Sequence, residues 1–231
     1  MYNYTANMEI PYGRFQFQLS GAQLGGASIL PIMAVIGWDN VEKINPRVWW
    51  IYEMIAIPMS LKFADKLYYK WHLTNGQASL VSAATNLGAI NTMLLLNLIY
   101  EDGWEDETLN KFYVPLTYLG AIGSGYLTKN YVSNKSYTED DAVFIEISSI
   151  VGLTNFIFLG NLLEMEDPKM NQLLLLTSVN GFTYLADKIN KNHDLKRGQA
   201  RIIGLGTFAS FMAWNGIALL VGVNDTNIYL L

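Results

Sequence analysis

Long stretches of mainly apolar residues alternate with short polar connections along this 231-residue chain. The clearest stretch covers residues 76–102, and it recurs. Aligned without gaps at Ala78, the segments that begin at Ala142 and Ala200 keep the same residue character at many positions, and a fourth copy opens the chain. The matching columns are Gly88 with Gly152 and Ser210; Thr85 with Ser149 and Thr207; Asn91 with Asn155; Asn97 with Asn161; Gly13 with Gly76; and Gly25 with Gly88.

The copies are offset by 63, 64 and 58 residues, which is the length of two helices with their turns. Such a period is typical of an array of helical hairpins whose neighbouring units share a core. The sequence therefore predicts an all-α fold, an array of antiparallel helical hairpins with about seven long helices in about 3.5 repeats. We expect an extended arm at residues 1–12 and a single domain over residues 13–231, with units at about 13–75, 76–138, 139–197 and 198–223.

Each unit should contain an apolar A helix followed by a B helix that starts apolar and ends polar. Thr74 with Gln77 and Thr138 with Asp141 have the spacing of a capping box, so A helices should begin there. Pro31 is expected to interrupt the first A helix, and Pro58 to kink the first B helix. The predicted A helices cover about 13–37, 77–100, 141–164 and 199–223, and the B helices about 47–70, 109–134 and 171–192.

Composition narrows the possible functions. Hydrophobic residues make up 51% of the chain and charged residues 15%, below the roughly 25% of an average soluble domain. The net charge of -5 excludes a general nucleic-acid binder, which needs a basic face. Cysteine is absent, so neither disulfides nor thiol chemistry enter the argument. The first residues do not resemble a secretory signal peptide.

Charge is distributed unequally between the two kinds of connection. The turns from A to B helices carry four basic and ten acidic residues, whereas the connections from B to A helices carry ten basic and six acidic residues. A membrane protein with seven spans and the second set of loops in the cytoplasm would show this asymmetry. Units copied from one ancestor would also inherit it in any solvent.

The polar residues inside the predicted helices favour the other alternative. A carboxylate in the middle of a bilayer costs about 3 kcal/mol, and the mean hydropathy of +0.18 is low for seven spans. We therefore expect a water-soluble or membrane-peripheral array, with the membrane-embedded bundle as the alternative. In either case the glycines inside the helices should serve close helix packing.

Repeated polar residues are the best candidates for a polar function. They could form a polar path through the bundle, but a packing role is favoured, in which each buried amide finds a hydrogen-bond partner on a neighbouring helix or at a turn. The small hydroxyls of Thr85, Ser149 and Thr207 are expected to bond to a carbonyl of the preceding helical turn. The candidates are Asn91, Asn97, Asn155, Asn161, Glu53 and Glu146.

Catalytic chemistry has no recognisable site in the sequence. The only histidines, His72 and His193, lie in connections and lack the spacing of metal ligands. There is no serine–histidine–acid set and no nucleotide-binding fingerprint. We therefore expect a non-enzymatic protein without cofactor or metal.

Three glycine-rich segments carry a resemblance: YGRFQFQLSGAQLGG at the start, LTNGQASLVSAATNLGA in the second unit and LKRGQARIIGLGTFAS in the last. In these the chain resembles glycine-rich helical-hairpin repeats of poorly characterised envelope proteins from Bacteroidetes-type bacteria. The resemblance implies a periplasmic or outer-membrane-associated structural part, such as a scaffold or a plug for a secretion channel, with protein partners. The alternative is a seven-helix transporter or channel component of the inner membrane.

Overall fold

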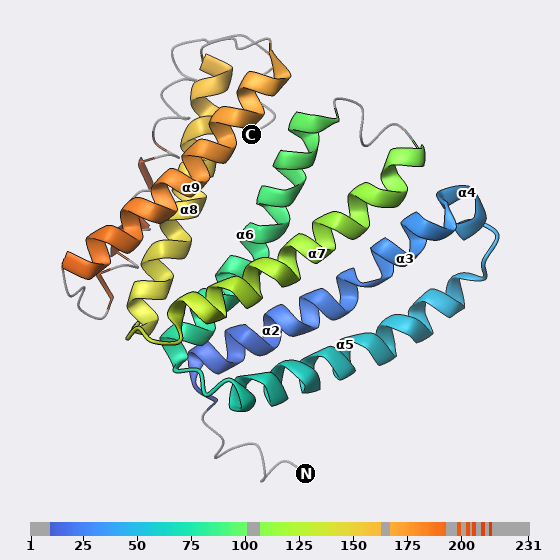
Figure 1. Ribbon diagram of the computed structural model, residues 1–231, viewed down its shortest axis with the longest axis horizontal. Helices are drawn as coiled ribbons and strands as arrows, with labels where there is room; N and C mark the ends of the chain where they lie inside the picture. The colour runs from blue at the N-terminus through green and yellow to red at the C-terminus, as the bar shows by residue number, and fades with distance from the viewer. Residues whose placement is uncertain are drawn as a thin grey trace. The chain divides into compact units, whose positions relative to one another are not determined.

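The computed structural model describes residues 10–100, 107–162 and 167–192, together with single positions between 198 and 213. Over these residues the fold is all-α, with no strand (Figure 1). The helices are α2 (Tyr12–Ala27), α3 (Ile29–Ile36), α4 (Trp38–Val41), α5 (Pro46–Lys70), α6 (Asn75–Ile99), α7 (Glu107–Val132), α8 (Glu139–Leu162) and α9 (Pro168–Asn192).

The observed helices match six of the predicted ones to within about three residues at most ends. The predicted fourth A helix, at 199–223, lies mainly outside the described residues. The first A helix is divided in two at Ser28, three residues before Pro31. Proline removes the hydrogen bond to the carbonyl four residues earlier and its ring clashes with that carbonyl, here the one of Ala27, where α2 ends.

Two smaller predictions concern single residues. The capping box at the start of α6 is confirmed, because the Thr74 amide donates to Gln77 Oε1 at 2.9 Å and the Gln77 amide to Thr74 Oγ1 at 3.3 Å. Pro58 lies inside α5, which runs through it as one helix.

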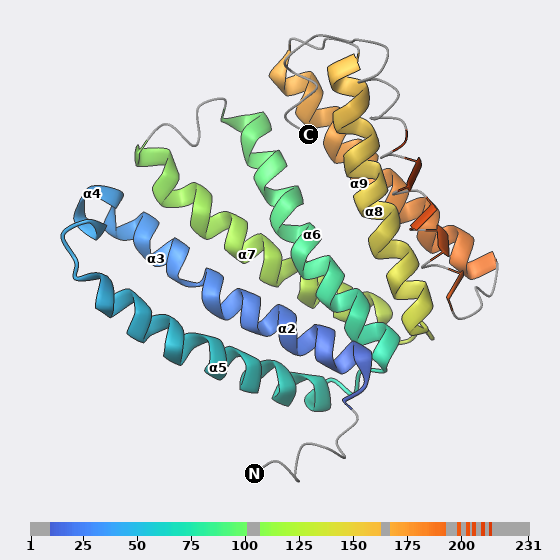
Figure 2. The same ribbon diagram turned by 180° about the vertical axis from the view of Figure 1, so that it is seen from behind.

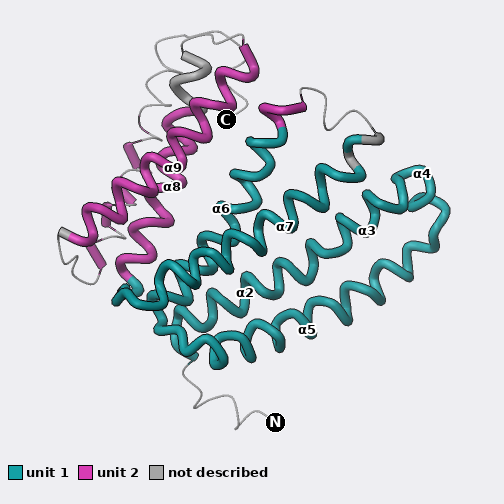
Figure 3. Tube along the Cα trace, in the orientation of Figure 1, with its two compact units in different colours: residues 1–96, 102–139 teal, residues 97–101, 140–231 magenta. Residues whose placement is uncertain are grey.

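The chain divides into two compact units, residues 1–96 with 102–139, and residues 97–101 with 140–231 (Figure 3). In the first unit, α2 with α3 lies between α5 and α7, and α6 lies beyond α7 in both views (Figures 1 and 2). The start of α2 also contacts the start of α6, since a Cβ on Gly13 would overlap the backbone of Asn75.

In this unit α2 and α6 begin at the end where α5 and α7 finish, which we call the basic end. Its basic side chains are Arg14, Lys62, Lys66, Lys70, Lys129 and Lys135.

The second unit contains the hairpin of α8 and α9. Ser149 Oγ and Thr183 Oγ1 share a hydrogen bond of 2.7 Å between the two helices. At the start of α8 the Asn190 side-chain amide donates to the Asp141 carbonyl at 3.1 Å. Polar bonds between the helices therefore accompany the packing of this hairpin.

Candidate functional site

The same close approach recurs in three helix pairs, at positions that align in the sequence repeat. In each pair a glycine of the first helix faces a backbone carbonyl of the second, so closely that a Cβ on the glycine would lie within 2.8 Å of that oxygen. Contacts this short leave no room for a side chain at the glycine position of the first helix. The pairs are Gly25 with Ala56 (2.8 Å), Gly88 with Gly120 (2.7 Å) and Gly152 with Ser178 (2.8 Å). We call these three contacts the glycine seams.

One helical turn further along the second helix, a second residue completes each seam. Ser60 faces Gly25, Ser124 faces Gly88, and in the second unit Phe182 stands at the equivalent place against Gly152. The sequence predicted the glycine column, but it did not reveal these partners. These partners occupy equivalent positions of the B helices, and the sequence alone does not show that each lies opposite the glycine of its A helix.

Some hydroxyl groups near the seams donate within their own helix, and Ser178 Oγ donates across the seam to the Gly152 carbonyl at 2.8 Å. Thr85 Oγ1 donates to the Val81 carbonyl at 2.8 Å, and Ser149 Oγ donates to the Ile145 carbonyl at 2.8 Å. Both bonds confirm the prediction of a carbonyl in the preceding turn, while Thr207 lies outside the described residues. These bonds leave small, internally paired polar groups at the helix contacts.

Large apolar side chains lie on the outside of the described helices as well as in their core. Among the described residues, Phe17, Leu80 and Phe144 are buried. Equally large apolar side chains point outward along α5, where Trp50 is 67% exposed and Met54 is 75% exposed. Soluble proteins place such residues in the core, and a large exposed apolar surface indicates a contact with something other than water.

Within the first unit, the predicted polar residues belong to different helices. Glu53 lies on α5 and Asn91 on α6 in the first unit, both half-buried. Asn97 lies near the end of α6 and is also half-buried. None of these three lines the cavities described below.

The other candidates belong to the second unit. Asn155 is exposed on α8, and its amide donates to the Val151 carbonyl of the same helix at 2.9 Å. Glu146 is half-buried on α8. Asn161 belongs to α8, but its side chain lies outside the described part of the structure.

Basic and aromatic side chains pair at the basic end of the first unit. Arg14 forms a salt bridge with Asp65 at 2.8 Å and lies over the Tyr69 ring, 4.9 Å from its centroid. The Lys129 ammonium lies 6.0 Å from the centroid of the Trp71 ring. Burial raises the pKa of the Tyr68 hydroxyl above its ordinary value, and this hydroxyl donates to Asn75 Oδ1 at 3.0 Å.

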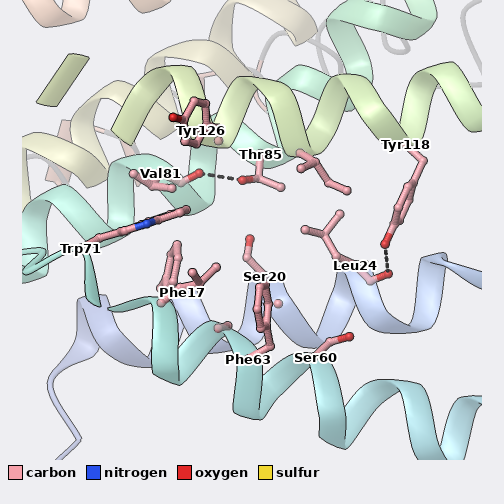
Figure 4. Close-up of a pocket in the computed structure, with 15 residues that line it drawn as sticks. Phe17, Ser20, Leu24, Ser60, Phe63, Trp71, Val81, Thr85, Tyr118 and Tyr126 are labelled. Atoms are coloured by element: carbon pink, nitrogen blue, oxygen red, sulfur yellow. Dashed lines mark hydrogen bonds between the residues drawn. The ribbon is translucent and has the colours of Figure 1, made fainter. Parts of the chain in front are cut away.

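Two neighbouring cavities lie among α2, α3, α5, α6 and α7. The first has a volume of about 200 Å³ and is lined by aromatic and small residues (Figure 4). The second has a volume of about 260 Å³ and continues toward Pro31 and Val114. Leu24, Thr85 and Tyr118 line both. Sequence reasoning missed this feature, because it depends on how four helices are turned about their axes.

The described residues contain no cluster of three or more histidine, aspartate or glutamate side chains that could hold a metal ion. Two helical stretches, Tyr12–Ile36 and Asn75–Ile99, are long and apolar enough by length and composition to cross a membrane. No known protein family, no curated protein and no solved structure matches the chain.

Proposed function

We propose that the protein is a non-enzymatic, membrane-embedded structural protein, a bundle of helical hairpins held together at its glycine seams and surrounded by lipid at its outer faces. The observation that carries this proposal is the set of large apolar side chains that α5 exposes, together with helix contacts built on glycine. In lipid, helices gain little from burying large apolar groups against one another. They associate through small residues that allow close backbone packing, as at Gly25, Gly88 and Gly152.

The placement of charge along the helices supports the same proposal. Residues 15–38, 75–99, 112–128 and 170–186 contain no charged side chain. A bilayer-spanning helix needs roughly 17–25 mainly apolar residues, and these stretches are of that length. Uncharged polar residues lower the hydropathy of α7 and α9. Several of their hydroxyls bond within the protein. Thr177 donates to the Leu173 carbonyl of its own helix at 2.7 Å, and Tyr118 donates to the Leu24 carbonyl of a neighbouring helix at 3.1 Å, so these groups are compatible with lipid.

Helix α5 departs from this pattern. Glu53 lies in its first half, and Lys62 and Lys66 in its second half. Lysine side chains are long enough to carry their ammonium groups toward the membrane surface while the stem stays in an apolar environment. The half-buried Glu53 on this helix and the half-buried Glu146 on α8 are features that the proposal has to accommodate at a cost.

The basic end of the first unit indicates how the protein would be oriented in the membrane, with this end on the cytoplasmic side. Positively charged residues are favoured on the cytoplasmic side, and aromatic residues are favoured at the membrane surface, where Tyr69, Trp71 and Tyr131 would lie. Because the chain has no cysteine, single cysteines report its topology directly. In intact cells, an impermeant maleimide should label Lys43→Cys and not Asn134→Cys, although both positions are exposed in the structure. Equal labelling of both before cell lysis would contradict the orientation.

The cavities favour a structural role over transport. No charged residue lines either of them, so they offer no path for an ion or a strongly polar solute. Glu53 and Asn91, which would be needed for such a path, are absent from their walls. We therefore place the function in the helix array itself and in the surfaces that it presents to lipid and to protein partners.

Fractionation of the full chain, expressed in cells, tests the proposal. We expect the protein to stay in the membrane pellet after washing with alkaline carbonate, and to enter the supernatant only with detergent. Recovery in the high-speed supernatant without detergent, as a compact helical species, would overturn it. That result would favour the second candidate, a soluble scaffold in which copies of the chain cover one another's apolar faces, which is supported by the low mean hydropathy of +0.18.

A further inference from the structure

The two cavities follow one line along the first unit. On α7 their lining residues recur on one helix face from Val114 to Tyr126, which corresponds to about 18 Å at 1.5 Å per residue. The shared residues Leu24, Thr85 and Tyr118 mark the place where the cavities meet. The two adjoining cavities together therefore extend slightly further than the roughly 15 Å depth of one leaflet of a bilayer core.

The chemistry of the walls selects an apolar occupant. Phe17, Phe63 and Trp71 line the first cavity, and Leu30 and Pro31 line the second (Figure 4). The walls contain no charged residue. Gln23 and Asn86 line the second cavity, as does Thr117, whose hydroxyl has no hydrogen-bond partner among the described residues. The hydroxyls of Ser20, Thr85 and Tyr118 are paired within the protein.

These pairs leave little for a polar ligand to bind. Tyr118 Oη donates to the Leu24 carbonyl at 3.1 Å, and Thr85 Oγ1 donates to the Val81 carbonyl at 2.8 Å. Ser20 Oγ and Ser82 Oγ lie 2.9 Å apart in a hydrogen bond. A ligand in this space would gain mainly from removing its hydrocarbon surface from water.

We propose that the two cavities together bind one long-chain acyl group with an anionic head. The volumes, about 200 and 260 Å³, together reach the lower part of the roughly 300–1,000 Å³ range of small-molecule sites. An occupant of both cavities has to pass Leu24, Thr85 and Tyr118, which a flexible chain does more easily than a rigid ring system. The site is independent of the membrane location of the protein, because a soluble protein could bind a fatty acid in the same place.

The head of the chain belongs at the Trp71 end. There the Lys129 ammonium lies 6.0 Å from the Trp71 ring centroid, and Trp71 itself lines the first cavity. No cation lines either cavity, and Lys129 is assigned to the Trp71 end by its contact with the Trp71 ring, which is a wall of the first cavity. Charge complementarity therefore places a carboxylate or phosphate near Lys129 and the methyl end of the chain near Pro31.

Quenching of tryptophan fluorescence by brominated chains tests the site. The purified full chain, in detergent if it needs one, keeps Trp71 alone, and the other tryptophans are replaced by phenylalanine. A second version keeps only Trp50, which is 67% exposed on the outward face of α5. We expect a brominated C18 fatty acid to quench Trp71 saturably with one site, at a concentration at least tenfold below that which quenches Trp50. Parallel quenching of both would overturn the proposal.

A pair of double variants separates cavity binding from surface adsorption. Leu24→Phe with Ala89→Phe fills the junction and the second cavity, and should weaken binding at Trp71 at least tenfold. Leu19→Phe with Leu95→Phe makes matched changes on the same two helices at positions that are 46% and 47% exposed, and should leave binding unchanged. Circular dichroism confirms that both variants fold. Equal binding by the filled and control variants would contradict the site.

Two further comparisons define the ligand. The brominated acid should bind about tenfold more tightly than the alcohol of the same length, and Lys129→Gln should remove this difference. Equal binding of acid and alcohol to the unaltered site would overturn the assignment of the head to Lys129. A brominated phospholipid in nanodiscs that quenches Trp71 beyond Trp50 identifies a bilayer lipid as the source. Quenching by the free acid alone identifies a fatty acid.

Discussion

The inner face of α6 and the outward face of α5 carry opposite kinds of side chain. On α6, Gly88 faces the α7 backbone so closely that a methyl group has no room. On α5, Trp50, Met54 and Met59 extend away from the other helices with more than half of their surface exposed. A water-soluble protein gains stability from burying its larger apolar groups, and α6 also buries Leu80 and Leu94. The difference indicates that close backbone packing contributes to the inner contact, whereas the outward face of α5 leaves large apolar groups uncovered.

A substitution on the outward face of α5 is expected to have the largest effect, which is on membrane insertion. Met59 lies near the middle of α5 and is 65% exposed. If this face contacts lipid, Met59→Lys should cost about 3 kcal/mol of insertion free energy, because a lysine at the centre of a bilayer is strongly disfavoured. The measurement is the fraction of the protein that resists carbonate extraction, which should fall sharply.

A matched lysine defines the depth of this effect. Val48, in the first turn of α5 beside Arg47, is 50% exposed, and Val48→Lys should be tolerated because it lies where charge is already present. If both variants behave as the unaltered chain does, α5 is facing water. Surface substitutions in water usually change stability by less than about 0.5 kcal/mol.

A substitution on the inner face of α6 is expected to have the next largest effect, which is on the free energy of unfolding. A Cβ at Gly88 would overlap Ser124 and lie 2.7 Å from the Gly120 carbonyl oxygen, so Gly88→Ala should force α6 and α7 apart. We expect a loss of about 2 kcal/mol in the free energy of unfolding. The measurement is thermal or denaturant unfolding followed by circular dichroism, in detergent if the protein needs it.

Gly123 is the control for this substitution. It lies on α7, where an added Cβ would meet nothing within 4 Å. Gly123→Ala should therefore raise stability by roughly 0.5–1 kcal/mol, since alanine is the better helix former. Two alanine variants with opposite signs would establish that the seam needs its glycine for space, whereas a loss in both would point to a general effect of replacing glycine.

The positions of the helices along the chain could be predicted well from the sequence, but the side of each helix that faces its neighbours could not. The capping box at Thr74 and the connection at 71–74 mark helix ends by local chemistry, and the glycine column marks the seams by recurrence. Helix α8 shows why the faces stayed hidden. Its apolar residues are spread around the whole helix, so no stripe indicates which side is buried. The cavity depends on four such helices at once.

The charge pattern illustrates a different limit. The unequal distribution of basic and acidic residues between the two kinds of connection is visible in the sequence, yet duplication and membrane orientation explain it equally well. The outward position of Trp50 and Met54 fits the membrane orientation proposed above, because duplication alone does not require large apolar residues at the surface. The candidate polar path was the weaker prediction. Asn155 bonds within its own helix, and the cavities that the structure contains are apolar.

Thr117 gives the smallest and most local prediction. It lines the second cavity, and its Oγ1 is buried without a hydrogen-bond partner, in contrast to the paired hydroxyl of Thr85 in the same walls. Thr117→Val keeps the shape and removes the unpaired group, so the free energy of unfolding should rise by about 1 kcal/mol. Thr85→Val, which breaks the bond to Val81 without leaving a buried donor, should change stability less. If Thr117→Val lowers stability, its hydroxyl has a partner in solution, and the second cavity is more polar than an acyl chain requires.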